Sequence, residues 1–362
     1  GIVEASVKLQ WDKVDDAKYP QFYQELKEYL KVIILEKNIS IEKKLLLTFH
    51  KYGLDLSDFD VNPLPEKIFD SSNETSNKVL VFAGFGGTLW NESYLKTNSL
   101  GGSETAVINM TRCLPKHLDI YVGGNVEEEK VDNITYVNMS NLPELIKNTK
   151  FHTIIISRYI SFFELFPYYS SKQSFIWAHD TVLSNYGCGI SDKAILGKWN
   201  THISGVVCLT EWHKEHFQSI YPELKEKIHL INNGINLSIF PKVDVKEPNS
   251  FMYSSCSERG LMRILQMWEL ILEKMPNAKL YISSYNPFPH NEDENKMNEI
   301  VQRFDSITHL GKLSQSQLYE RMATTEFWLY PTSWPETSCI TALEMLKNEV
   351  ICIYYPTAGL VN

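Results

Sequence analysis

A chain of 362 residues exceeds what one hydrophobic core usually serves, so its length predicts two or more domains. The apolar share of 43% is typical of a globular protein, and a net charge of −9 without a run of Lys or Arg argues against nucleic acid as a partner. No apolar run reaches the ~20 residues needed to cross a bilayer, so we expect no transmembrane segment.

Cysteine usage bears on the compartment. The six cysteines are scattered, with no C-x-x-C pair, which argues against a structural zinc site and a disulfide framework. No apolar segment of a signal peptide can be recognised near Glu4 and Lys8. We therefore expect a reducing, cytoplasmic location.

The first part of the chain differs in pattern from the rest. Apolar residues at helical spacing between Tyr19 and Tyr52 predict two helices. The stretch from Leu54 to Asn77 is rich in Asp, Asn, Ser and Pro, which is the composition of a linker. We expect residues 1–76 to form a small helical N-terminal appendage, whose helices are candidates for contact with another domain or protein.

From Lys78 onward, short apolar runs alternate with helical stretches, as in a series of β-α-β units. Several runs are continuously apolar, which indicates strands buried on both faces of a parallel sheet. A linker around Ile239–Ser250 divides the series, so we predict one domain over residues 77–245 and a second over 246–362. In the first domain we expect strands at Val79–Ala83, Ile120–Val122, Thr153–Ile156, Ser174–Ala178, Val206–Leu209 and His229–Ile231, and helices at Glu104–Leu114 and Glu211–Ile220. In the second we expect strands at Phe251–Ser254, Lys279–Ser283, Ile307–Leu310, Phe327–Tyr330 and Val350–Tyr354, and helices at Met262–Met275, Lys296–Phe304, Gln315–Ala323 and Cys339–Leu346.

The predicted fold is therefore α/β, with two doubly wound domains in tandem. Ligands of such folds bind at the carboxyl ends of the strands, here in the crevice between the domains. One glycine-rich loop, Gly101-Gly102-Ser103-Glu104, opens a predicted helix and can present backbone N–H groups to a phosphate or a sugar hydroxyl. A tight strand-to-helix turn alone would use the same glycines. The Gly84-x-Gly86 turn lacks the third glycine of the dinucleotide fingerprint, because Leu89 stands there.

Histidines occur in two contexts. His179 and Asp180 follow a predicted strand, where a histidine beside a carboxylate can bond a hydroxyl or relay a proton, although a lone histidine is more often structural. His213 and His216 lie one turn apart without the His-Glu-x-x-His order or a third ligand. This pattern indicates a helix surface rather than a metal site.

Two segments of the second domain carry candidate chemistry. Arg259 lies beside a predicted helix N-terminus, where a diphosphate leaving group requires a cation; a solvated arginine without a ligand is the alternative. Further on, a loop presents Glu336, and a helix expected to begin near Ser338 contains Glu344. Two helical turns separate these carboxylates, so both can face one ligand. The apolar neighbours of Glu344 require its carboxylate to have a partner.

In these segments and in their order, the sequence from Lys78 to Asn362 resembles the retaining glycosyltransferases of family 4, in the GT-B superfamily. The resemblance implies two Rossmann-like domains with a cleft between them, and transfer of a sugar from a nucleoside diphosphate donor with retention at the anomeric carbon. It implies no metal and no other cofactor. It rests on these segments: Gly101–Glu104, Trp177–Asp180, Leu209–Trp212, Ile231–Ile235, Ser257–Leu261, and the E-x7-E pair Glu336 and Glu344.

The resemblance also implies roles for individual residues. Glu336 would lie at the sugar and is a candidate catalytic residue together with His179, while Glu344 would hold the ribose. Arg259 would meet the donor phosphates. Other expected donor contacts are Gly102, Ser257, Thr337, Ser338 and Cys339. The expected acceptor or sugar contacts are Gly101, Ser103 and Asp180.

The sequence departs from the family pattern in three places. Arg259 stands near the position of a family lysine, and a serine occupies the upstream arginine position, for which Arg263 is a candidate substitute. Thr337 and Ser338 replace a glycine-containing turn. The family's second domain continues past the segment that resembles Pro356–Leu360, so we expect a shortened form or a fragment of a larger protein.

The sequence leaves three other functions open. A metal-dependent transferase needs an Asp-x-Asp pair, and Asp58-x-Asp60 has that spacing but lies in the polar linker before Pro63. A catalytically inactive nucleotide-sugar-binding or interaction module fits the altered phosphate residues but not the intact E-x7-E pair. A nucleotide-sugar epimerase on the same fold is the third. The acceptor can be a glycan, a lipid or a protein, and the base and the sugar of the donor stay open.

Overall fold

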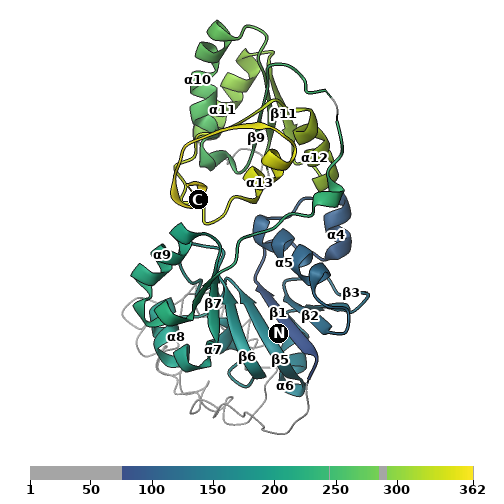
Figure 1. Ribbon diagram of the computed structural model, residues 1–362, viewed down its shortest axis with the longest axis vertical. Coiled ribbons are helices and arrows are strands. Elements are labelled where there is room, and N and C mark those ends of the chain that lie inside the picture. The colour runs from purple at the N-terminus through teal and green to yellow at the C-terminus, as the bar shows by residue number, and fades with distance from the viewer. Residues whose placement is uncertain (1–75, 244, 285–291, 362) are drawn as a thin grey trace, which may run out of the picture.

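The computed structural model describes residues 76–243, 245–284 and 292–361. The predicted N-terminal appendage, apart from Ser76, and the Asp58-x-Asp60 pair lie outside the described residues. Two β-sheets with packed helices make up a first unit, residues 76–230, and a second unit, residues 250–361, drawn at the bottom and the top of Figure 1. This confirms the predicted α/β fold of two Rossmann-like units.

The first sheet has eight strands in the order β3-β4-β2-β1-β5-β6-β7-β8. All pairs are parallel except β3 with β4 at the edge. The order reverses between β1 and β5, which makes this the topological switch point. The strands are β1 (Lys78–Gly84), β2 (Asp119–Gly124), β3 (Glu129–Val131), β4 (Ile134–Asn138), β5 (Lys150–Ser157), β6 (Ser170–Trp177), β7 (Gly205–Cys208) and β8 (Ile228–Leu230). The helices are α4 (Glu92–Thr97), α5 (Gly102–Cys113), α6 (Leu142–Asn148), α7 (Phe162–Leu165), α8 (Asp192–Trp199) and α9 (Glu211–Ile220).

The second sheet has five parallel strands in the order β11-β10-β9-β12-β13. Its order reverses between β9 and β12, so it repeats the arrangement of the first sheet. The strands are β9 (Ser250–Ser254), β10 (Lys279–Ser283), β11 (Ile307–Gly311), β12 (Phe327–Tyr330) and β13 (Ile351–Tyr354). The helices are α10 (Leu261–Lys274), α11 (Glu292–Arg303), α12 (Gln315–Thr324) and α13 (Ile340–Lys347). Among the described helices, none combines the length and the apolar character needed to cross a membrane.

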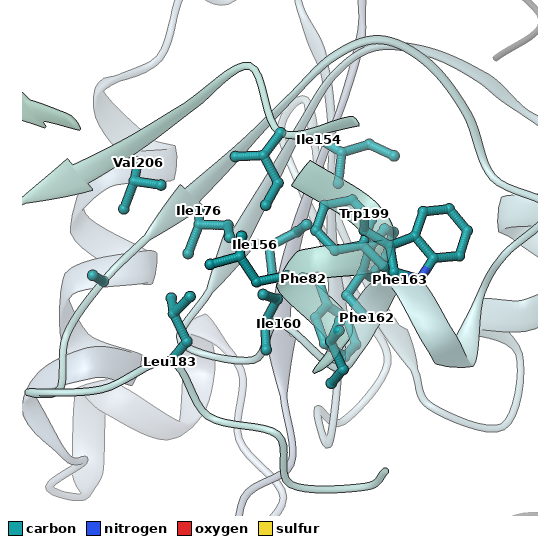
Figure 2. Close-up of a cluster of buried hydrophobic side chains, with 14 of the residues drawn as sticks. Phe82, Ile154, Ile156, Ile160, Phe162, Phe163, Ile176, Leu183, Trp199 and Val206 are labelled. Carbon is teal, nitrogen blue, oxygen red and sulfur yellow. The ribbon is translucent and has the colours of Figure 1, made fainter. Parts of the chain in front are cut away.

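The core of the first unit holds its switch point in place. Phe82 on β1 is fully buried, and its ring lies 5.1 Å from that of Phe162. Phe163 stacks on Trp199 of α8 at 5.6 Å, and Figure 2 shows these rings packed together with the isoleucines of β5 and β6. Burial of each such side chain contributes roughly 1.5–3 kcal/mol. The loops that follow β1 and β5 therefore start from strands that are closely packed in the core.

Two of the contacts between the units involve helices. In the first, α4 lies beside α12. In the second, α9 contacts a short 3₁₀ helix at Ala358–Leu360, close to the C-terminus marked in Figure 1. Leu360 belongs to the core of the second unit, so this C-terminal segment joins that core to the first unit.

One glycine is required where two loops of the second unit cross. Gly260 precedes α10 with a φ of 111°, in the left-handed region. A Cβ atom at this position would lie 2.7 Å from the carbonyl oxygen of Pro331, which follows β12. Only glycine meets both conditions without strain, and it lets the loop after β9 approach the loop after β12.

We expect Gly260→Ala to lower the free energy of unfolding by about 1–3 kcal/mol, since it adds both backbone strain and a clash. Urea denaturation measures the change. Gly234→Ala is the matched control, because Gly234 is exposed and a Cβ atom there meets nothing within 4 Å. Equal effects of the two substitutions would show that the close approach of the two loops does not require glycine at position 260.

Candidate functional site

The carboxyl ends of the central strands of both sheets border one cavity of about 530 Å³ between the units. Ser254 ends β9, Tyr330 ends β12 and Arg158 follows β5, and all three line it. The volume is within the range of ~300–1,000 Å³ usual for ligand sites. The cleft predicted from the sequence is therefore present, at the switch points of the two sheets.

A smaller cavity of about 90 Å³ adjoins the larger one. Glu336 lines the larger cavity and Glu344 lines the smaller. The residues that border both are Gly102, Ser254, Ser255, Ile340 and Thr341. The two carboxylates thus lie on the same side of the second unit, toward the first unit. A Cβ atom at Gly102 would meet nothing within 4 Å, so the helix start at α5 leaves open space beside both cavities.

Glu336 is held by its side chain and by its backbone. Arg259 Nη1 donates to Glu336 Oε1 at 2.8 Å, and Tyr330 Oη donates to the same oxygen at 2.6 Å. The backbone N–H of Gly359 donates to the Glu336 carbonyl at 2.7 Å. The Glu336 side chain is only 9% exposed, so these bonds set where its carboxylate lies.

The charges around Glu336 follow from these contacts. Burial by itself lowers the pKa of Arg259, but Glu336 and Tyr330 raise it more, and the net result is above the ordinary value. Burial and then Glu336 raise the pKa of Tyr330, which keeps its phenol neutral. Arg259 is therefore a permanent cation at the cavity wall, and its guanidinium lies 5.1 Å from the centre of the Trp334 ring.

Arg263, the candidate substitute for the family arginine, does not reach either cavity. Arg263 donates to the Pro331 carbonyl at 2.9 Å and to Ser333 Oγ at 3.1 Å, and it lines neither cavity. Ser257, expected to be a donor contact, is buried and also lines neither cavity.

Glu344 has the partner that its apolar surroundings require. Tyr319 Oη donates to Glu344 Oε1 at 2.8 Å. Burial raises the pKa of Glu344 to about 7, although the Tyr319 bond opposes the shift. Three hydroxyls around the same smaller cavity, those of Ser99, Ser254 and Ser284, are buried and make no hydrogen bond. A buried hydroxyl without a partner costs roughly 1–3 kcal/mol, so this lining suits a polar ligand.

A cation that the sequence analysis missed lies on the first unit. Arg158 has a φ of 70°, and its guanidinium forms a two-point ion pair with Asp180 at 2.7 and 2.8 Å. It also donates to Ser103 Oγ at 2.9 Å, and Ser103 donates to Glu104 at 2.9 Å. The signal in the sequence was the position of Arg158 directly after a central strand, where ligand-binding loops begin.

His179 lies in the same wall and is neutral. Burial and then the charge of Arg158 lower its pKa to about 3. Its Nε2 is buried without a hydrogen-bond partner, and the residue lines the larger cavity. A neutral imidazole of this kind can exchange a hydrogen bond with a ligand hydroxyl but is a weak base at neutral pH.

The prediction that His213 lies on a helix surface is wrong. His213 is fully buried on α9, and burial lowers its pKa to about 4. Its Nδ1 accepts from the Leu209 N–H at 3.2 Å, so its Nε2 donates to the Asp180 carbonyl at 3.0 Å. It therefore holds the loop that carries Asp180. Its neighbour His216 is half-buried and stacks on Trp212 at 4.8 Å. Among the described residues, no three His, Cys, Asp or Glu side chains are grouped so as to hold a metal ion.

The loop between Glu336 and α13 joins the two units. Thr337 Oγ1 donates to the His179 carbonyl at 2.7 Å, and Thr210 Oγ1 donates to the Thr337 carbonyl at 3.0 Å. Ser338 and Cys339 line the larger cavity, and α13 begins at Ile340, slightly later than the sequence predicted. Burial raises the pKa of Cys339 to about 12, so its thiol is neutral. On the opposite wall, the larger cavity is lined by Gly101 and Ser103, which the sequence predicted to contact the acceptor or the sugar.

Solved structures share this architecture. HepE of Anabaena, in complex with UDP and glucose, matches with a TM-score of 0.55 and 12% identity over 78% of this chain and 82% of HepE. The catalytic domain of starch synthase IV from Arabidopsis thaliana, bound to ADP and acarbose, matches with a TM-score of 0.55 and 12% identity over 78% and 83%. An E. coli trehalose-6-phosphate protein bound with UDP-2-fluoro glucose matches with a TM-score of 0.54 and 11% identity over 79% and 86%.

The chain has the GT-B fold. No family model matches its sequence, and no curated protein sequence matches it either. At 11 to 12% identity, the likeness to these structures concerns the fold alone. The roles of individual residues therefore depend on the geometry described above.

The raised pKa of Glu344 predicts a pH dependence of stability. The folded state favours the protonated carboxyl, so its contribution is fully present below the ordinary pKa of 4.5 and is lost as the pH rises through about 7. We expect Glu344→Gln to remove this loss and to gain up to about 3 kcal/mol over the wild type at pH 8. Urea denaturation at pH 4.5 and pH 8 measures the difference. Glu320→Gln, at an exposed position of α12, is the control. A gap between wild type and E344Q that does not widen with pH would contradict the assignment.

Proposed function

We propose that this chain is a glycosyltransferase that moves a sugar from a nucleoside diphosphate sugar to an acceptor hydroxyl, with retention and without a catalytic metal. One observation carries the proposal: two adjoining cavities lie at the meeting point of two Rossmann-like sheets, with Glu336 in one and Glu344 in the other. A nucleotide sugar has a matching two-part form. In this proposal residues 77–245 form the acceptor-side domain and residues 246–362 the donor domain.

The donor binds with its nucleoside toward the smaller cavity and its diphosphate and sugar in the larger one. Glu344 accepts from the ribose hydroxyls, and the unpaired hydroxyls of Ser99 and Ser284 supply further polar contacts. The cavity of about 90 Å³ is smaller than the ~150 Å³ that holds one benzene ring, so its walls move apart on binding. HepE and starch synthase IV, which share the fold, were solved with UDP and ADP respectively, which supports a nucleotide here.

Arg259 stabilises the charge that gathers on the leaving diphosphate. A cation fixed beside the leaving group lowers the barrier because it needs no reorganisation when the charge develops. Both Arg259 and Tyr330 donate to Oε1 of Glu336, which leaves Oε2 for a hydroxyl of the transferred sugar. Binding and orientation of the sugar are the roles we assign to Glu336.

Proton transfer in this proposal uses the substrate. His179, with a pKa of about 3, is a weak base at neutral pH, and Asp180 is bound to Arg158 by two hydrogen bonds. The bond from the anomeric carbon to the phosphate oxygen breaks, and the bond to the acceptor oxygen forms on the same face. The proton of the acceptor hydroxyl passes to the departing phosphate oxygen. His179 contacts the sugar or the acceptor through a hydrogen bond at its unpartnered Nε2.

A second candidate function is a nucleotide-sugar-binding module without turnover. Arg263 is directed away from the larger cavity, which favours this alternative. Among the described residues, the arginines that line this cavity are Arg259 and Arg158. Because Arg158 belongs to the opposite wall, Arg259 is left as the arginine beside the diphosphate. Release of nucleoside diphosphate from UDP-, GDP- and ADP-sugars, measured with a chelator present, separates the two functions. Binding without release across the panel would favour the module, and turnover without any acceptor would point to an epimerase.

The two carboxylates should respond differently to substitution. We expect Glu344→Ala to weaken binding of the nucleoside diphosphate about tenfold, because it removes a hydrogen bond to the ribose. We expect Glu336→Ala to lower turnover about 100-fold, with a smaller effect on binding. Calorimetric titration and initial rates measure these changes, and Glu320→Ala on the exposed face of α12 is the control. Negligible effects of both substitutions would refute the assignment.

A further inference from the structure

The acceptor side of the larger cavity has an unusual charge arrangement. Two carboxylates, Glu104 and Asp180, line it from the first unit, and Arg158 is the cation beside them. Arg158 bonds both oxygens of Asp180 and reaches Glu104 through the hydroxyl of Ser103. His179 adds no charge, because its pKa is about 3. We call the wall formed by Glu104, Arg158, His179 and Asp180 the acceptor wall. It carries two negative charges and one positive charge.

An anionic ligand group would fit this wall poorly. The Nε and Nη2 atoms of Arg158 are already used by Asp180. A phosphate placed against Arg158 would also lie beside two carboxylates, and like charges in a partly buried site are strongly unfavourable. A neutral hydroxyl has no such conflict, since it can donate to a carboxylate and accept from the guanidinium or from the His179 ring.

The opposite wall differs in both charge and shape. There Arg259 is paired with Glu336, and the Trp334 ring is 53% exposed at the same cavity. An aromatic ring at the edge of a polar site offers a flat apolar surface to the carbon face of a ring-shaped ligand. A hydroxyl-rich molecule with apolar ring faces therefore matches both walls together.

We infer that the acceptor is a neutral glycan, and that the acceptor wall rejects acceptors with a phosphate or carboxylate next to the reacting hydroxyl. The inference rests on the proposed function, since it names the acceptor class of the same site. Rejection by like charge is specificity through an unfavourable contact with the wrong ligand.

The test compares neutral sugars with their phosphorylated forms. Protein saturated with the nucleoside diphosphate that it binds best is titrated with glucose, galactose, mannose and N-acetylglucosamine, their disaccharides, and the matching 6-phosphates. We expect a neutral sugar to bind about tenfold or more tightly than its phosphorylated form at low salt. The difference should shrink toward 1 M salt, where the Debye length is only ~3 Å. A purely steric rejection would not change with salt.

Two variants locate the effect. Asp180→Asn removes one carboxylate and leaves Arg158 unpaired, so phosphorylated sugars should gain about tenfold relative to neutral ones. Glu104→Gln keeps the Arg158–Asp180 pair and should give a smaller shift in the same direction, which keeps the test decisive if D180N does not fold. Glu215→Gln, on the exposed face of α9, is the control and should change nothing.

Each outcome decides the inference. Equal or tighter binding of the phosphorylated sugars, binding of no neutral sugar, or no response to the two variants would overturn it. The proposed function would survive those results, provided that nucleoside diphosphates bind and nucleotide sugars turn over. Failure of the wild type to bind any nucleoside diphosphate would instead count against the proposed function itself.

Discussion

Thr337 is the residue on which the arrangement of the site depends. Its hydroxyl donates to the carbonyl of His179, and its carbonyl accepts from the hydroxyl of Thr210. Because Glu336 is its neighbour in the chain, these two bonds set the position of the Glu336 loop against the wall that carries His179. The bond from Gly359 to the Glu336 carbonyl adds a third support from the C-terminal segment. In the proposed function, this arrangement brings a nucleotide sugar on the second unit against an acceptor on the first.

The charged side chains at the cavity differ between the two units. On the second unit, the charges of Arg259 and Glu336 neutralise each other, and Tyr330 donates to the same Glu336 oxygen as Arg259. On the first unit, Arg158 forms an ion pair with Asp180, and Glu104 gives the acceptor wall a net negative charge. Under the proposed function, the diphosphate of the donor meets Arg259 on the second unit, and the reacting hydroxyl of a neutral acceptor meets the wall around Arg158 on the first. Burial keeps His179 uncharged, so it adds no charge to either wall.

The sequence predicted most of the fold, because continuous apolar runs identify buried parallel strands. The bounds of β10, β12 and α9 agree with the prediction, and the main strands of both sheets were found. The edge strand β3 was missed because two of its three residues, Glu129 and Lys130, are charged, so it carries no apolar pattern. Its neighbour β4 was missed as well.

The site was less predictable, because the functions of side chains depend on contacts between distant segments. Glu336, Glu344 and Arg259 were predicted from their motifs and line the two cavities, but nothing local indicates that Arg259 and Tyr330 share one oxygen of Glu336. His213 was placed on a surface, although Phe217 four residues later marks the buried face of α9. Ser257 was expected at the donor but lines neither cavity. Arg158 and the unpaired serines required the structure.

Hydrogen–deuterium exchange of the protein with and without a bound nucleoside diphosphate shows whether both units border one nucleotide-sugar site. We expect slower exchange in two segments at once, Gly101–Glu104 at the start of α5 and Thr337–Thr341 at the start of α13, which lie on opposite sides of the cavities. Protection confined to one unit, or found away from these segments, would contradict this expectation.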